Sequence, residues 1–152
     1  MAYATQAQLT PLRLTAAELT QLTLDVPSGN PATDAATTAS VTAAALEEAS
    51  GKVDSYCRAR YQTPLQADDD IVGLTIDIAL YLLFSRRRSS KMSETVRQRY
   101  EDAIGFLKDI AASRASLDQP VGDVAQSASA GPTISCRDHK LRFKDRHLEG
   151  FV

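Results

Sequence analysis

The sequence predicts an all-α protein, in which three long helices and two short N-terminal helices form a small bundle that is followed by an extended C-terminal arm. Apolar residues recur at steps of three and four through three long segments, which is the period of amphipathic helices. Residues that cap helices precede these segments. The periodicity stops after residue 113. We therefore expect a bundle domain at residues 1–113 and an arm at residues 114–152.

The two short helices are expected at the N-terminus. Thr5 can cap a helix that runs to Leu12. Thr15 and Glu18 have the spacing of a capping box, which opens a second helix through about Leu22. Residues 25–34 contain two prolines and a glycine, so we expect a loop without regular structure there.

The first two long helices differ in how their apolar residues are distributed. The first is expected from about Thr38 to Tyr61, with apolar residues on one side. The second begins at the aspartates 68–70 and ends at the arginines 86–88, charges that complement a helix dipole. Between them the segment 71–84 is apolar nearly all round, which is typical of a central, buried helix.

The third long helix and the arm complete the predicted architecture. Ser93 can cap a helix that runs to about Ser113 with an apolar stripe. Residues 122–131 are small and polar and cannot bury a core of their own. The last part of the arm carries apolar and aromatic side chains that need a surface to cover them. The residues that we predict to bind a partner are Leu141, Phe143, Arg146, Leu148 and Phe151.

The near-zero net charge gives the chain as a whole no attraction to polyanions such as nucleic acid. One local patch, however, is basic. The chain has 17 basic and 19 acidic residues and a net charge of −2. The basic patch consists of Arg86, Arg87, Arg88 and Lys91. It could contact DNA phosphates, together with the basic arm. It could equally meet an acidic partner protein or cap its own helix.

The sequence contains no recognisable catalytic, cofactor-binding or metal-binding set, and we expect no enzyme activity. Glycine-rich phosphate loops and the common hydrolase and zinc motifs are absent. Cys57 and Cys136 are interpreted as free thiols of a reducing compartment. Asp77 interrupts the apolar helix, where it could act as a general base. The favoured interpretation is a structural partner of an arginine or a tyrosine hydroxyl. Tyr81 and Tyr100 are also assigned structural roles.

Several short stretches, taken in order, resemble a known family. They are Tyr3-Ala4-Thr5-Gln6, Val53-Asp54-Ser55-Tyr56 with Arg60-Tyr61 and Pro64-Leu65, Asp77-Ile78-Ala79 with Tyr81, Arg99-Tyr100-Glu101-Asp102-Ala103 with Leu107, and a C-terminal Phe143, Arg146, Leu148, Gly150 and Phe151. In order and spacing they resemble small proteins of Mu-like tailed phages and prophages, which look related to head–tail connectors, the neck adaptors.

The resemblance implies a structural role in the virion. Such adaptors are helical bundles that form a ring, commonly dodecameric, beneath the portal. The implied partners are the portal protein, neighbouring copies of the chain, and the next neck or tail-terminator protein, while packaged DNA passes through without sequence-specific binding. We therefore expect synthesis in the host cytoplasm, a place in the virion neck and no membrane contact. The alternative is a small DNA-binding regulator that uses residues 86–88 and the basic arm.

Overall fold

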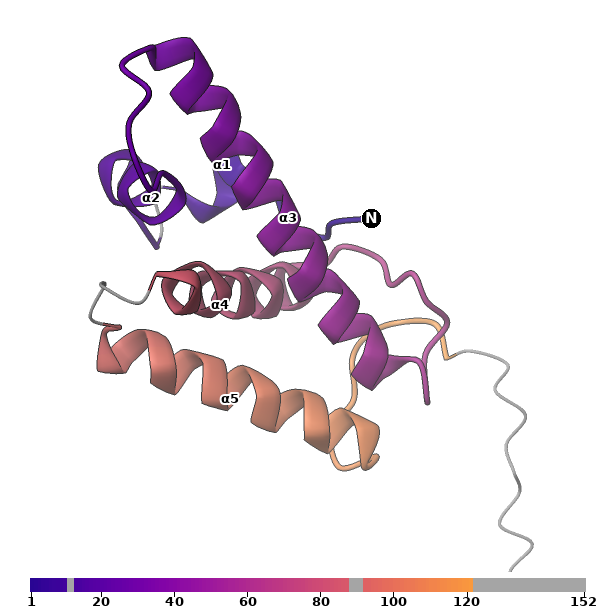
Figure 1. Ribbon diagram of the computed structural model, residues 1–152. Coiled ribbons are helices and arrows are strands. Elements are labelled where there is room, and N and C mark those ends of the chain that lie inside the picture. The colour runs from indigo at the N-terminus through magenta and orange to yellow at the C-terminus, as the bar shows by residue number, and fades with distance from the viewer. Residues whose placement is uncertain (11–12, 88–91, 122–152) are drawn as a thin grey trace, which may run out of the picture.

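The computed structural model describes residues 1–10, 13–87 and 92–121, and it confirms the predicted helical bundle. The described residues form five helices and no strand. The short helices are α1 (Gln6–Leu9) and α2 (Ala16–Thr23). The long helices are α3 (Pro31–Cys57), α4 (Asp69–Arg86) and α5 (Glu94–Ala111). Figure 1 shows α4 between α3 and α5, with α2 packed beside α3 at one end of the bundle.

Both short helices begin with capping boxes; the one at Thr15 was predicted, and at Thr5 only the cap itself was. The Thr5 backbone N–H donates to Gln8 Oε1 at 2.9 Å, and the Thr15 N–H donates to Glu18 Oε2 at 2.9 Å. These bonds satisfy N–H groups that the start of a helix otherwise leaves unpaired. The first helix stops at Leu9, so its predicted extension to Leu12 is wrong.

The first long helix begins earlier than predicted, inside the segment that we expected to be a loop. Asn30 caps α3 by accepting a hydrogen bond from the Ala32 N–H at 3.1 Å. Pro31 occupies the first helical position, where its missing N–H has no helical partner to lose. The prolines and glycine of residues 25–34 therefore mark both a loop and a helix start. At its other end α3 stops at Cys57 rather than Tyr61.

The central helix is buried as its sequence predicts. Asp68 caps it, accepting from the Asp69 N–H at 2.8 Å. Its fully covered residues point to several sides of the helix: Ile71, Thr75, Ile76, Ile78, Ala79, Leu80 and Leu83. Helices α2, α3 and α5 all pack against it. By contrast, α5 buries one stripe, formed by Ala103, Leu107 and Ile110.

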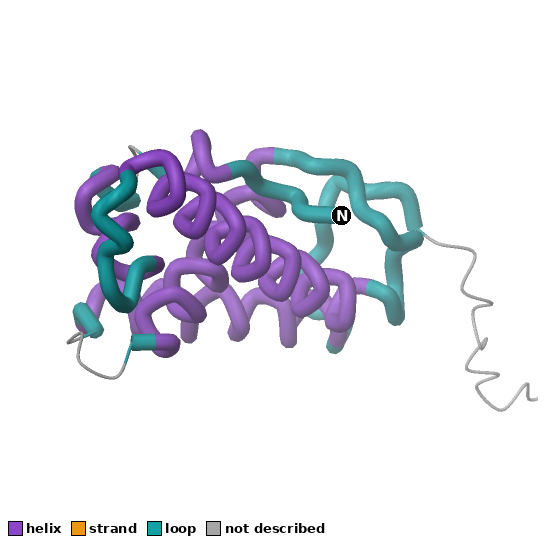
Figure 2. Tube along the Cα trace, turned by 45° about the horizontal axis from the view of Figure 1, so that its top comes forward, coloured by secondary structure: helices purple, strands orange, loops and turns teal. Residues whose placement is uncertain are grey.

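The chain that follows α5 turns back along the end of α3. Arg60 Nη1 donates to the Ala115 carbonyl at 2.6 Å, and the Leu117 N–H donates to the Tyr61 hydroxyl at 2.8 Å. Figure 2 shows these loops at the same end of the bundle as the N-terminus. Residues 114–121, which we expected in the arm, therefore contact the bundle. The rest of the predicted arm lies outside the described residues.

The N-terminal segment is held to the bundle by Tyr3. Its backbone N–H donates to Ser50 Oγ at 3.0 Å. Its buried hydroxyl donates to the Asp54 carboxylate and accepts from the Leu65 N–H, the latter at 2.8 Å. One hydroxyl thus joins the chain start, α3 and the loop before α4. Burial, and then the hydrogen bond to Asp54, raises the pKa of Tyr3 to about 12.

The substitution Tyr3→Phe should lower the free energy of unfolding by about 1–3 kcal/mol, because a buried N–H and a carboxylate each lose a partner. Urea unfolding would measure the loss. Tyr56→Phe is the matched control, since Tyr56 is a partly buried tyrosine of α3 whose hydroxyl bonds to no described residue. Equal losses in the two variants would contradict the role given to the Tyr3 hydroxyl.

The same hydroxyl should make stability depend on alkaline pH. Its folded-state pKa of about 12 lies above the ordinary value of 10.0. Its contribution is therefore complete below about pH 10 and is lost as the pH rises toward about 12. Unfolding measured at about pH 9 and pH 11 should show a larger loss of stability for the native chain than for Tyr3→Phe. Parallel losses would rule this dependence out.

Candidate functional site

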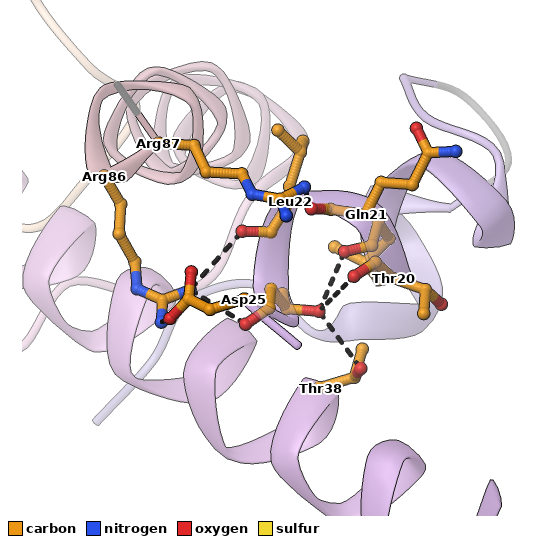
Figure 3. Close-up of polar contacts among 9 residues, drawn as sticks. Thr20, Gln21, Leu22, Asp25, Thr38, Arg86 and Arg87 are labelled. Atoms are coloured by element: carbon orange, nitrogen blue, oxygen red, sulfur yellow. Dashed lines mark hydrogen bonds and ion pairs between the residues drawn. The ribbon is translucent and has the colours of Figure 1, made fainter. Parts of the chain in front are cut away.

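The described half of the basic patch makes contacts within the bundle. Arg86 Nη1 donates to the Thr23 carbonyl at 2.8 Å, and Arg86 Nη2 pairs with Asp25 Oδ2 at 2.8 Å. Arg87 Nη1 donates to the Gln21 carbonyl. Figure 3 shows both arginines reaching from the end of α4 to the last turn of α2. Arg88 and Lys91 lie outside the described residues.

Through these contacts, the two arginines stabilise the C-terminal end of α2. The last carbonyls of a helix have no partner within it, and they carry the negative end of its dipole. The guanidinium groups supply both donors and positive charge at that end of α2. On the inner side, the buried Thr23 hydroxyl lies 3.0 Å from the Thr38 hydroxyl of α3. Helix α2 is thus tied to α4 and α3 by polar contacts, in addition to its buried leucines.

Asp77 lies beside an arginine at the surface of α4. Arg13 Nε is 3.3 Å from Asp77 Oδ1, and the Asp77 side chain is 16% exposed. Burial raises the pKa of Asp77, and the charges of Arg13 and Arg99 oppose that rise. The buried Oδ1 atom has no well-aligned hydrogen bond among the described residues, although the ion pair is close. The pair therefore offsets only part of the cost of burying the carboxylate.

Tyr81 and Tyr100 join two of the long helices. Their rings stack with centroids 3.8 Å apart and planes 11° apart, linking α4 to α5. Lys52 of α3 places its Nζ atom 5.9 Å from the centre of the Tyr100 ring, within the range of a cation–π contact. This cluster ties all three long helices together.

A groove between α3 and α4 was not predicted from the sequence. It has a volume of about 500 Å³. Its lining is mainly aliphatic, with polar or charged groups from three residues: the lining consists of Val41, Ala44, Ala45, Glu48, Leu82, Leu83, Ser85 and Arg86. Pockets of this size commonly hold apolar side chains or small molecules.

The thiol and carboxylate groups show no arrangement for catalysis or metal binding within the described ranges. Cys57 is buried at the end of α3, and burial raises the pKa of its thiol to about 11. Such a thiol is a poor nucleophile, because the thiolate is the reactive form. No group of three or more His, Cys, Asp or Glu side chains within the described part could hold a metal ion. Cys136 and both histidines lie outside that part.

The structure brings together some predicted residues and adds others. Tyr81 and Tyr100 stack on each other, whereas Arg86 and Arg87, five and six residues after Tyr81, contact the end of α2 instead. The five predicted arm residues lie outside the described part of the chain. Sequence reasoning did not identify Tyr3, Arg13 or Asp25 as partners. Tyr3 belongs to one of the stretches that carry the family resemblance, which is the one signal that pointed to it.

Replacing Arg86 with Ala should loosen α2 selectively. We expect a loss of about 1–2 kcal/mol, because two helix-end carbonyls and Asp25 lose a charged donor. Hydrogen exchange of α2 amides should accelerate about tenfold, while α5 amides change little, as measured by mass spectrometry. The control is Arg97→Ala, which removes an exposed pair with Glu101 and should cost under about 0.5 kcal/mol. Uniform acceleration across all helices would contradict a local role.

The substitution Asp77→Asn should raise the free energy of unfolding near pH 7. A folded-state pKa above the ordinary value means that folding favours the protonated carboxyl, which Asn mimics. In the native chain, the stability that comes from the protonated Asp77 carboxyl is complete below the unfolded-state pKa. It is lost as the pH rises through the folded-state pKa. The gain of the variant should therefore shrink as the pH falls toward about 4. Asp102→Asn on the exposed side of α5 is the control. A destabilised Asp77→Asn at pH 7 would show that the Arg13 pair outweighs burial.

The comparisons with known proteins give the chain a family. Within the described ranges, no helix has the length and hydropathy needed to cross a bilayer. A search of curated proteins found no match. Residues 3–135 match the family model described as bacteriophage Mu, Gp36, a range that includes all five described helices. Because the match spans far more than half of the 152 residues, the chain belongs to this family and is a phage protein of the Mu type.

Proposed function

We propose that this protein is a head–tail connector subunit, a neck adaptor that forms a ring beneath the portal and links the phage head to the tail. The observation that carries the proposal is the family match over residues 3–135, which indicates a phage structural or morphogenesis protein. The head–tail connector role goes beyond that match and is based on the resemblance of the short sequence stretches to neck adaptors. The proposed role is non-enzymatic and places the protein in the virion neck after synthesis in the host cytoplasm.

The bundle has physical features that suit a ring subunit. A ring requires two different surfaces on each subunit, so that each copy contacts the next head to tail. The first half of α3 extends beyond α4 and α5 in Figure 1. Its exposed residues include six alanines, namely Ala32, Ala35, Ala36, Ala39, Ala43 and Ala44. Small side chains let a neighbouring backbone approach closely, and this half of α3 supports a subunit contact.

The proposed partners divide between the bundle and the arm. The bundle would contact neighbouring copies and the next neck or tail-terminator protein. The arm would contact the portal or a neighbour through its apolar and basic residues, with Phe143, Arg146 and Phe151 among them. Arg side chains and aromatic rings are the residues that most often dominate protein interfaces. Packaged DNA would pass through the ring without sequence-specific contacts.

The alternative, a DNA-binding regulator, draws less support from the described residues. Arg86 and Arg87 were two of its candidate phosphate contacts, and both donate to the backbone of α2. A guanidinium group that is engaged in this way is less available to phosphate. Electrophoretic mobility shifts at low salt would test the alternative with the isolated protein, because phosphate contacts weaken steeply with salt.

Deleting residues 132–152 should leave the bundle folded but abolish attachment to the portal. The described helices all lie before residue 122, so circular dichroism should retain the helical signal. A pull-down with purified portal protein should then show loss of binding. The control is Arg97→Ala in the full chain, which should bind normally. Unchanged binding by the truncated chain would refute the role of the arm, and absence of the protein from mass spectra of purified virions would refute the connector role itself.

A further inference from the structure

The groove between α3 and α4 presents apolar surface that the bundle leaves partly uncovered. Val41, Ala45 and Leu82 line it, and all three are only partly buried against the core. Ala44 on its rim is exposed. Apolar surface of this kind favours a ligand that removes it from water. The volume of about 500 Å³ suits a few side chains of leucine or phenylalanine size.

We propose that this groove binds residues 141–151 of the same chain in the free subunit. The segment carries the four large apolar residues Leu141, Phe143, Leu148 and Phe151. They are spaced closely enough for two or more to enter one groove. The inference concerns the isolated protein and does not depend on the proposed place in the virion.

The described chain ends close enough to the groove for residues 141–151 to reach it. Val121 pairs with Tyr61 just beyond the end of α3. Counting back along α3 from Cys57, Glu48 and Val41 are 9 and 16 residues away, or roughly 14 and 24 Å at the rise of an α-helix. The connecting stretch, residues 122–140, has 140 − 121 = 19 residues. A chain of that length rich in Gly, Ser and Ala has a root-mean-square span of about 22–26 Å.

This match of span and distance favours binding within one chain. The effective concentration of a tethered ligand is highest when the tether's average span equals the distance to its site. For short tethers it reaches the millimolar range, far above the concentration of a second copy in dilute solution. A weak apolar contact can therefore be well populated within the chain.

The acidic residues at the groove complement the net positive charge of residues 141–151. Glu48 lines the groove, the neighbouring Glu47 is also exposed, and neither forms an ion pair with a described residue. The segment carries three basic residues, Arg142, Lys144 and Arg146, and two acidic ones, Asp145 and Glu149, so its net charge is +1 with His147 neutral. Leucine and phenylalanine side chains could enter the groove while the basic groups meet these carboxylates at its rim. Arg86, the basic residue of the described lining, is paired with Asp25.

Disulfide trapping tests the proposal in the full chain. The test variant combines Ala44→Cys in the groove with Gly150→Cys beside the last apolar anchor, in a Cys136→Ser background. Cys57 stays, because it is buried. The control moves the groove cysteine to Ser55→Cys, an exposed site on α3 that lies outside the groove lining and nearer the point where the described chain ends, so the tether alone would favour the control. Under mild oxidation the test variant should form an intramolecular disulfide at least tenfold faster than the control, visible as a faster monomer band on a non-reducing gel.

Two results would overturn the proposal. Equal cross-linking rates in test and control variants would show that the segment samples the surface without preference. Dimers in place of cross-linked monomers would show that the groove binds the arm of another copy. As a second measurement, Ala44→Lys should accelerate hydrogen exchange and tryptic cleavage in residues 141–151, whereas Ala36→Lys should not. Failure of these tests would leave the connector role standing, since that role depends on the virion and portal experiments.

Discussion

Burial of α4 is the constraint on which the rest of the structure depends. A helix that is apolar nearly all round cannot face water on any long side, so the other helices must enclose it. Helices α3 and α5 cover it along its length, and α2 covers part of the remaining surface. Each fully buried leucine or isoleucine contributes roughly 1.5–3 kcal/mol relative to exposure. Ile78 and Leu83 are 0% and 1% exposed.

Polar contacts at the two ends of the bundle decide where the shorter segments lie. At one end, Arg86 and Arg87 hold the last turn of α2. At the other end, Tyr3, Arg60 and Tyr61 hold the N-terminus and the chain that follows α5. These contacts join residues that lie far apart in the sequence. The groove lies where residues 41–48 of α3 face the last turns of α4, next to Arg86.

The sequence predicted the helices well because their signals are local. Apolar periodicity, capping boxes and the aspartates before α4 each involve neighbouring residues. The start of α3 was missed because Asn30 and Pro31 are equally typical of loops and of helix starts, and composition alone favoured the loop. The contacts of Tyr3 with Asp54 and of Arg86 with Thr23 span 51 and 63 residues. No local pattern encodes such pairs, so the basic triplet suggested an external ligand or a cap of its own helix, and its contacts with the end of α2 were not predicted.

The connector role requires a ring of these subunits beneath the portal, and one measurement can check for that ring. Cryo-electron microscopy of the virion neck should show a ring of repeated densities beneath the portal, each of which accommodates the α3–α4–α5 bundle. The ring should surround the DNA channel, and α4 should stay enclosed within each subunit. A neck reconstruction at side-chain resolution whose rings are all built from other chains would contradict the connector role.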